Sequence, residues 1–250
     1  MIGAGSTLHY FDNNLNNTNN AIAEVGYNYQ WTKEDTIAVY YTFGALRYNN
    51  INQSINSNSV QVAYARRLTG RLAFQVSGGP QWILSTLPIT NSSGAITTVT
   101  TQTRQLYGTA YAALTYTVRR NSLGANYSHG VTGGSGLLAG AVSDYATGTF
   151  TRQMSRLTSL ALSVGYSRNT GIALTPNTGT KIAPSQTYNY FFGGANMTHR
   201  FGGVLGMTLG YQYQYQTSNV PFCVTAPCGT NYTSNQIYFD LNFHPRLIPF

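Results

Sequence analysis

Few residues in this chain could carry out chemistry, and they do not gather in the sequence. The four histidines lie far apart, at His9, His129, His199 and His244. Catalysis needs a titratable pair, or a nucleophile and a base, within hydrogen-bonding reach. Ser128 and His129 are adjacent, but adjacent residues of a strand point to opposite faces. The six acidic residues show no paired spacing either. We therefore predict isolated histidines and a protein that is not an enzyme.

The two cysteines, Cys223 and Cys228, lie close together in a polar segment. No histidine or carboxylate lies beside them to complete a tetrahedral metal site. We expect a local disulfide in an oxidising compartment, and two free thiols are the alternative. The Gly-Gly-Ser-Gly run at residues 133–136 lacks the strand and helix that flank a phosphate-binding loop. The sequence thus predicts no metal and no cofactor.

The composition argues against an ordinary soluble domain. Only 8% of the 250 residues are charged, whereas globular proteins average about 25%. The mean hydropathy is nevertheless −0.18, because glycine (26 residues), tyrosine (20 residues) and small polar residues fill the gap. No apolar run approaches the roughly 18 residues of a helical membrane span. The N-terminus lacks the basic and apolar segments of a signal peptide, so we interpret the sequence as a mature or truncated chain.

Twelve segments alternate apolar residues with small or polar ones, which predicts β-strands with two different faces. Strands of roughly ten residues with this alternation are typical of transmembrane β-barrels. A soluble sandwich or a lipocalin-like barrel would show the same alternation and is the alternative. The predicted strands fall near residues 2–11, 21–31, 36–48, 58–67, 71–83, 104–118, 122–130, 143–152, 157–168, 187–200, 204–217 and 233–244.

The connections between these segments are alternately short and long. This alternation predicts an up-and-down antiparallel meander, with all short turns on one rim and all long loops on the other. Trp31 and Trp82 near strand ends suit aromatic girdles at the two membrane interfaces. The short connections are residues 32–35, 68–70, 119–121, 153–156 and 201–203, and the long ones are 12–20, 49–57, 84–103, 131–142, 169–186 and 218–232.

The phase of each strand assigns an outward apolar face and an inward face of small and polar residues. In the strand at 233–244, for example, Ile237 and Phe239 point outward whereas Tyr238 and Asp240 point inward. Small polar linings favour a water-filled interior, and tyrosines there could stack on sugar rings or simply fill a narrow barrel. The candidate interior residues that contact solutes are Glu24, Tyr40, Tyr107, Tyr111, Tyr145, Gln212, Gln214, Tyr238 and Asp240.

The meander, the last strand with the sequence QIYFDLNF at 236–243 and the C-terminal Phe250 resemble those of bacterial outer-membrane β-barrels of the porin-like kind. The resemblance covers the whole chain and implies one all-β domain of about twelve strands at residues 1–250, integral to the outer membrane. It also implies contact with outer-membrane lipid and lipopolysaccharide, and with the barrel-assembly machinery, which recognises a terminal aromatic residue. The chain departs from the pattern at 244–249, where two prolines cannot continue a ladder.

Basic residues concentrate at the predicted short-turn rim. They could anchor the barrel against acidic headgroups, or form an electropositive vestibule that attracts anionic solutes. No motif supports nucleic-acid binding, although the isoelectric point is about 9.5. The rim residues are Lys33, Arg66, Arg67, Arg71, Arg119, Arg120, Arg152, Arg156, Arg200 and Arg246.

Three functions fit this reading. The first is a porin-like channel for passive diffusion of small hydrophilic solutes, including saccharides. The second is the translocator or anchor barrel of a larger secreted or surface protein, as in autotransporters. The third is a surface receptor or adhesin that acts through its long loops. The sequence identifies neither a solute nor an oligomeric state.

Overall fold

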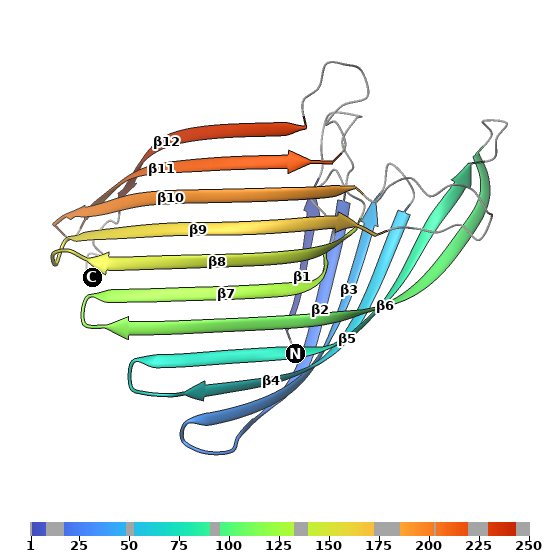
Figure 1. Cartoon of the computed structure of the whole chain (residues 1–250), viewed down its shortest axis with the longest axis horizontal. Coiled ribbons are helices and arrows are strands. Elements are labelled where there is room, and N and C mark those ends of the chain that lie inside the picture. The colour runs from blue at the N-terminus through green and yellow to red at the C-terminus, as the bar shows by residue number, and fades with distance from the viewer. Residues whose placement is uncertain are drawn as a thin grey trace, which may run out of the picture.

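A computed structural model describes residues 2–8, 18–48, 53–90, 96–132, 140–172, 186–202, 204–219 and 230–243. Twelve antiparallel strands form one sheet in chain order (Figure 1). This order confirms the predicted meander. The strands are β1 (Ile2–Leu8), β2 (Thr18–Gln30), β3 (Asp35–Tyr48), β4 (Gln53–Arg67), β5 (Leu72–Thr90), β6 (Ile96–Val118), β7 (Asn121–Thr132), β8 (Ala141–Gln153), β9 (Thr158–Gly171), β10 (Thr187–Phe201), β11 (Leu205–Ser218) and β12 (Asn231–Phe243).

The sheet curls strongly, so that one face is turned inward. In Figure 1, β1–β3 run steeply behind the nearly horizontal β8–β12. Each strand pairs with the next one in sequence, and β1 and β12 are not paired with each other in the described part of the chain. No helix among the described residues is long and apolar enough to cross a membrane.

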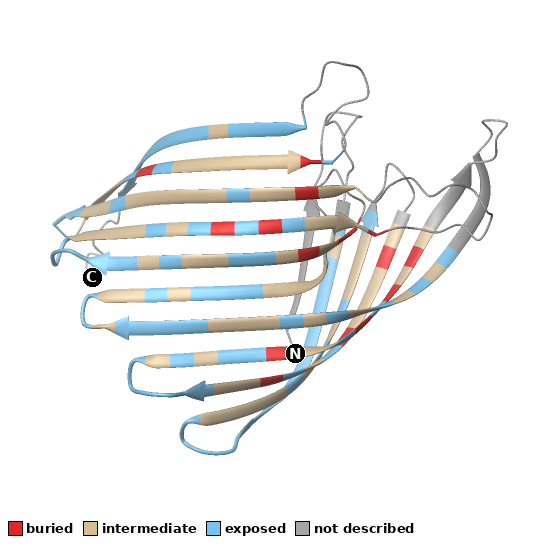
Figure 2. Ribbon diagram, in the orientation of Figure 1, coloured by how far each residue is buried: buried red, intermediate tan, exposed pale blue. Residues whose placement is uncertain are grey.

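The two faces of the sheet differ as the alternation predicts. On β9, Leu162 and Val164 are 42% and 48% exposed, whereas the inward residues that follow them, Gly165 and Ser167, are buried. On β12, Ile237 is 80% exposed. Figure 2 shows the same bands of exposure and burial along β8, β9 and β10. An outward face this apolar suits lipid, because water would penalise so large an exposed hydrophobic surface.

Two predicted connections differ most from the structure in extent. Residues 53–57 belong to β4, and residues 84–90 and 96–103 belong to β5 and β6. These segments are rich in Asn, Ser and Thr, which indicates contact with water but does not prevent pairing, because the ladder is made by the backbone. The β5–β6 hairpin therefore projects beyond its neighbours (Figure 1). Trp82, predicted near a strand end, lies within β5 on the outward face opposite Asn58 and Leu106.

Candidate functional site

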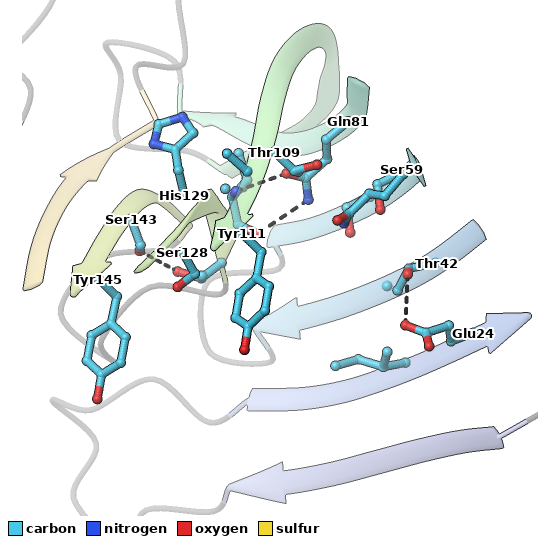
Figure 3. Close-up of a pocket in the computed structure, with 18 of the residues that line it drawn as sticks. Glu24, Thr42, Ser59, Gln81, Thr109, Tyr111, Ser128, His129, Ser143 and Tyr145 are labelled. Atoms are coloured by element: carbon cyan, nitrogen blue, oxygen red, sulfur yellow. Dashed lines mark hydrogen bonds between the residues drawn. The ribbon is translucent and has the colours of Figure 1, made fainter. Parts of the chain in front are cut away.

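A polar hollow of about 660 Å³ lies on the inward side of the sheet (Figure 3). Its volume falls within the roughly 300–1,000 Å³ typical of small-ligand sites. Strands β2 to β9 all contribute to it, so the curl brings together positions far apart in sequence. The lining residues are Ile22, Glu24, Tyr40, Thr42, Gly44, Ser57, Ser59, Gln61, Gln81, Thr109, Ala110, Tyr111, Ser128, His129, Gly130, Val131, Thr132, Ser143, Tyr145, Ser167 and Asn169.

Hydrogen bonds between neighbouring strands fix one wall of the hollow. The Tyr40 hydroxyl lies 2.8 Å from Gln61 Oε1 and 2.9 Å from Ser77 Oγ. Thr42 Oγ1 donates to Glu24 Oε2 at 3.2 Å (Figure 3). Glu24 is the only carboxylate among the lining residues. The wall thus offers fixed polar groups and a single negative charge to whatever occupies the hollow.

The opposite wall presents tyrosines. The rings of Tyr111 and Tyr145 extend into the hollow in Figure 3. Neither hydroxyl has a side-chain or backbone hydrogen-bond partner among the described residues, and the Tyr145 ring stacks on Phe192 with centroids 6.3 Å apart. A supported ring with a free hydroxyl can both stack on an apolar face and donate a hydrogen bond. This arrangement suits neutral, hydroxyl-rich molecules.

The structure brings four of the nine predicted interior residues into this hollow, namely Glu24, Tyr40, Tyr111 and Tyr145. The other five lie outside it. The Tyr107 hydroxyl bonds to Gln105 Oε1 at 2.7 Å, and its ring packs against a small apolar cluster. Gln212, Gln214, Tyr238 and Asp240 lie farther round the sheet on β11 and β12, where Asp240 accepts a 2.6 Å hydrogen bond from Asn242. Contact of any of the nine with a solute stays a prediction.

Several lining residues were not singled out from the sequence. Ser143 Oγ donates to Asn169 Oδ1 at 2.6 Å, and the Gln81 side chain bonds to the backbone of Val131. All three polar side chains are inward by strand phase, which is the signal that could have found them. Strand phase applies equally to every small polar residue of an inward face, so it does not single out these three.

One histidine expected to be isolated has an acidic partner. His129 Nδ1 lies 2.7 Å from Asp144 Oδ1, the residue opposite it on β8. Tyr127 donates to the same oxygen at 2.7 Å. The register between β7 and β8 creates this contact, which sequence spacing did not reveal. Ser128 points to the other face, so the pair has no adjacent nucleophile. Among the described residues, no group of three or more His, Cys, Asp or Glu could hold a metal ion.

A recurring pair marks the outward face on the long-loop side. A tyrosine hydroxyl donates to an Asn or Asp on the next strand, at the position diagonally nearer the loops. Such pairs place the polar tip of an amphipathic ring toward water and its body toward lipid. The four pairs are Tyr41 with Asn58, Tyr127 with Asp144, Tyr166 with Asn189 and Tyr211 with Asn235, at 2.5–2.9 Å.

The short-turn rim carries nine of the ten predicted basic residues, all exposed; Arg246 lies outside the described residues. At this rim the Asp35 carboxylate accepts hydrogen bonds from Thr32 at 2.6 Å and Tyr64 at 2.7 Å, with Arg66 Nε 3.6 Å away. These contacts lower the pKa of Asp35, through the Thr32 hydrogen bond first, then Tyr64 and the charge of Arg66. Asp35 lies at the turn, outside the membrane-spanning segments. Cys223 and Cys228 lie outside the described residues, so their disulfide stays a prediction.

Comparisons with known proteins identify the architecture. No protein-family model matches this chain, and no curated protein matches it in sequence. In fold, the chain is similar to the FrpB iron transporter from Neisseria meningitidis, with a TM-score of 0.53 and 8% identity, over 81% of this chain and 36% of the transporter. The fold is that of a bacterial outer-membrane β-barrel. The chain spans about a third of the length of the FrpB transporter.

Two further solved structures are similar at lower scores. The TodX monoaromatic hydrocarbon channel, as a deltaS2 mutant, has a TM-score of 0.49 and 11% identity over 92% of this chain and 75% of its own. A mutant of the ferric enterobactin receptor PfeA from Pseudomonas aeruginosa has a TM-score of 0.49 and 10% identity, over 95% of this chain and 40% of the receptor. The outward apolar face and the tyrosine pairs agree with the fold of the transporter: this chain has the surface of an integral outer-membrane protein.

Proposed function

We propose that this outer-membrane barrel is a channel for passive diffusion of small hydrophilic solutes, saccharides among them. The observation that carries the proposal is the polar hollow inside the sheet. Its lining is rich in hydroxyls and amides, with one carboxylate, and two tyrosine hydroxyls have no partner among the described residues. Weak, distributed polar contacts allow a solute to enter and to leave, whereas a strong charged site would retain it.

Planar-bilayer recording and liposome swelling with the refolded chain test the proposal. We expect stepwise conductance, and swelling rates that fall as the saccharide becomes larger. Absence of both would overturn the channel and favour the translocator, or a receptor that acts through its loops. The upstream sequence of the full-length protein would then separate these two, because a translocator is preceded by a passenger domain.

Saccharide contact is tested by Tyr111→Ala, which removes a ring from the hollow. Tyr116→Ala is the matched control, because Tyr116 is a tyrosine of the same strand on the outward face. We expect sugar-induced block of the ion current to weaken severalfold in Tyr111→Ala and to stay unchanged in the control. Equal block in both variants would remove the tyrosines from the solute path.

The basic rim, we propose, contacts acidic headgroups of lipid and lipopolysaccharide. Among the described residues of this rim, the nine exposed basic residues outnumber two acidic ones, Glu34 and Asp35. Replacing Arg119, Arg120 and Arg156 together with glutamine should impair membrane assembly and leave ion selectivity unchanged. A change in selectivity with normal assembly would instead assign these residues to a vestibule for anions.

A further inference from the structure

The wall of the barrel divides between β6 and β7. These strands pair from Val118 opposite Asn121 to Ala110 opposite His129. Beyond that point the described part of β6 pairs with β5, whereas the last residues of β7 pair with β8, up to Thr132 opposite Ala141. At their long-loop ends, β7, β8 and β9 therefore separate from β6 but stay paired with one another, and β9 stays paired with β10 up to Thr170 opposite Thr187. We call these ends of β7, β8 and β9 the tip.

The side chain of Gln81 holds this tip from the inside. Gln81 Nε2 donates to the carbonyl oxygen of Val131 at 3.3 Å, and Gln81 Oε1 accepts from the Val131 N–H at 2.9 Å. One amide thus satisfies both backbone groups of a residue that has no partner on β6. Gln81 is on β5, two strands away from β7, and it is 7% exposed. A buried double hydrogen bond of this kind fixes position, because its loss leaves backbone groups unpaired.

The tip reaches the opposite part of the barrel. Ile172, just after β9, packs with Ile55 of β4 and Ile83 of β5, and these three side chains are 8%, 4% and 2% exposed. Five strand-to-strand spacings separate β4 from β9. At roughly 4.8 Å for each spacing, this is about 24 Å along the wall. Contact between them therefore crosses the interior. We call these three isoleucines, with Gly140 and Val131, the cap.

Glycine at position 140 makes this contact possible. Gly140 has φ of 89°, a conformation that L side chains rarely adopt, and a Cβ there would collide with Ile55 Cδ1. The Ile172 N–H donates to the Gly140 carbonyl oxygen at 3.2 Å, which closes the tip over Ile55. The contact between the tip and Ile55 therefore needs both the positive φ at position 140 and the absence of a side chain there.

The cap lies between the hollow and the long loops. Along β4, Ile55 is followed toward the short turn by Ser57 and Ser59, which line the hollow; along β5, Gln81 of the hollow is followed toward the loops by Ile83. A solute that moves between the long loops and the hollow on this side therefore passes the apolar side chains of the cap. Hydrophobic constrictions resist hydrated solutes, and more strongly as the opening narrows.

We propose that the cap sets the largest saccharide that reaches the polar hollow from the long-loop side, and that Gln81 is the residue that holds it closed. This inference rests on the proposed channel function and adds a size limit to it. Gln81 also lines the hollow, but its role in the cap is to position the tip, and Ile83→Ala tests the cap with Gln81 unchanged.

The first experiment tests the cap without transport. Ile55→Cys is combined with Ile172→Cys in the chain in which Cys223 and Cys228 are replaced with serine. We expect an oxidative or short bifunctional cross-link, seen as a shift in gel mobility of the folded protein in liposomes. Ile55→Cys combined with Thr198→Cys, which is on β10 near the short turns, should give none. Absence of the cross-link in a folded barrel would overturn the cap.

The second experiment measures the size limit by liposome swelling with mono-, di-, tri- and tetrasaccharides. Gln81→Leu keeps the volume and removes the amide, and Ile83→Ala opens the cap without touching Gln81. Both should speed the entry of the larger saccharides severalfold. The control is Gln75→Leu, an exposed residue of the same strand and the same inward phase as Gln81.

The outcomes separate the two proposals. In one outcome the cross-link forms, Gln81→Leu and Ile83→Ala keep the size limit of the parent, and all chains admit the monosaccharide. That result overturns the cap as a filter and leaves the proposed channel intact. A cross-link with no saccharide entry in any chain overturns the channel, and the filter with it. A cross-link with a raised limit in Gln81→Leu and Ile83→Ala, but not in Gln75→Leu, supports both.

Discussion

Leu162 provides a sharp test of which face of the sheet meets lipid. It lies near the middle of β9, on the outward face, between Phe150 of β8 and Ala195 of β10. Its neighbour Ser163 faces inward, between Thr149 and Gly194. An arginine on the lipid face at the bilayer midplane costs about 2–4 kcal/mol, whereas an arginine in a polar interior is tolerated.

Leu162→Arg should therefore lower the free energy of unfolding in lipid vesicles by about 2–4 kcal/mol. That range corresponds to roughly a 30- to 700-fold change in the folding equilibrium. With a urea slope of about 3 kcal/mol per M, the unfolding midpoint should fall by about 1 M. Urea titration, followed by tryptophan fluorescence and by heat-dependent gel mobility, measures this shift.

Two matched variants make the test specific. Ser163→Arg, one residue along the strand, should change the stability by less than about 0.5 kcal/mol. Tyr166→Arg, nearer the long-loop interface, should cost about 0–1 kcal/mol from its charge, because the penalty falls toward the interface. If Ser163→Arg proved as costly as Leu162→Arg, or if Leu162→Arg cost nothing, the assignment of faces would be refuted.

Three further predictions concern single sites. Glu24→Gln should shift the reversal potential in a salt gradient toward anions, and by more than Glu34→Gln at the exposed turn, because Glu24 is the only carboxylate lining the hollow; equal shifts would place Glu24 outside the ion path. The pKa of Asp35 is lowered from 3.8, so the stability it contributes is complete above the ordinary carboxyl range and is lost as the pH falls through the lowered value. Acid titration of unfolding should therefore show a smaller loss in Asp35→Asn than in the parent, and identical acid limbs would contradict this. Gly202 has φ of 65° and open space around it, so Gly202→Ala should cost about 1–2 kcal/mol. Gly70 also has open space around it but lacks a positive φ, so Gly70→Ala should not lower the free energy of unfolding. A similar loss of stability in the two variants would rule out backbone strain as the cause.

The sequence by itself determined the number of strands, their order and their two faces. Successive residues of a strand point to opposite faces, so the apolar and polar positions alternate with a period of two. Leu162 and Ser163 can therefore be assigned to the outward and inward faces without knowledge of any other strand. The alternation of short and long connections then ordered the strands. At residues 84–90 and 96–103 the polar composition predicts a loop, but these residues belong to β5 and β6, because backbone pairing continues through polar residues.

Only the tertiary structure decided which inward residues meet. Gln81 and Val131 are fifty residues apart in sequence, and His129 meets Asp144 only through the register of β7 and β8. Curling of the sheet gathers Glu24 and Tyr145 around one hollow and leaves Asp240 outside it. These contacts depend on pairing register and on the inward fold of the β7–β9 tip. Both are properties of several strands together, and a single strand's alternation carries no record of them.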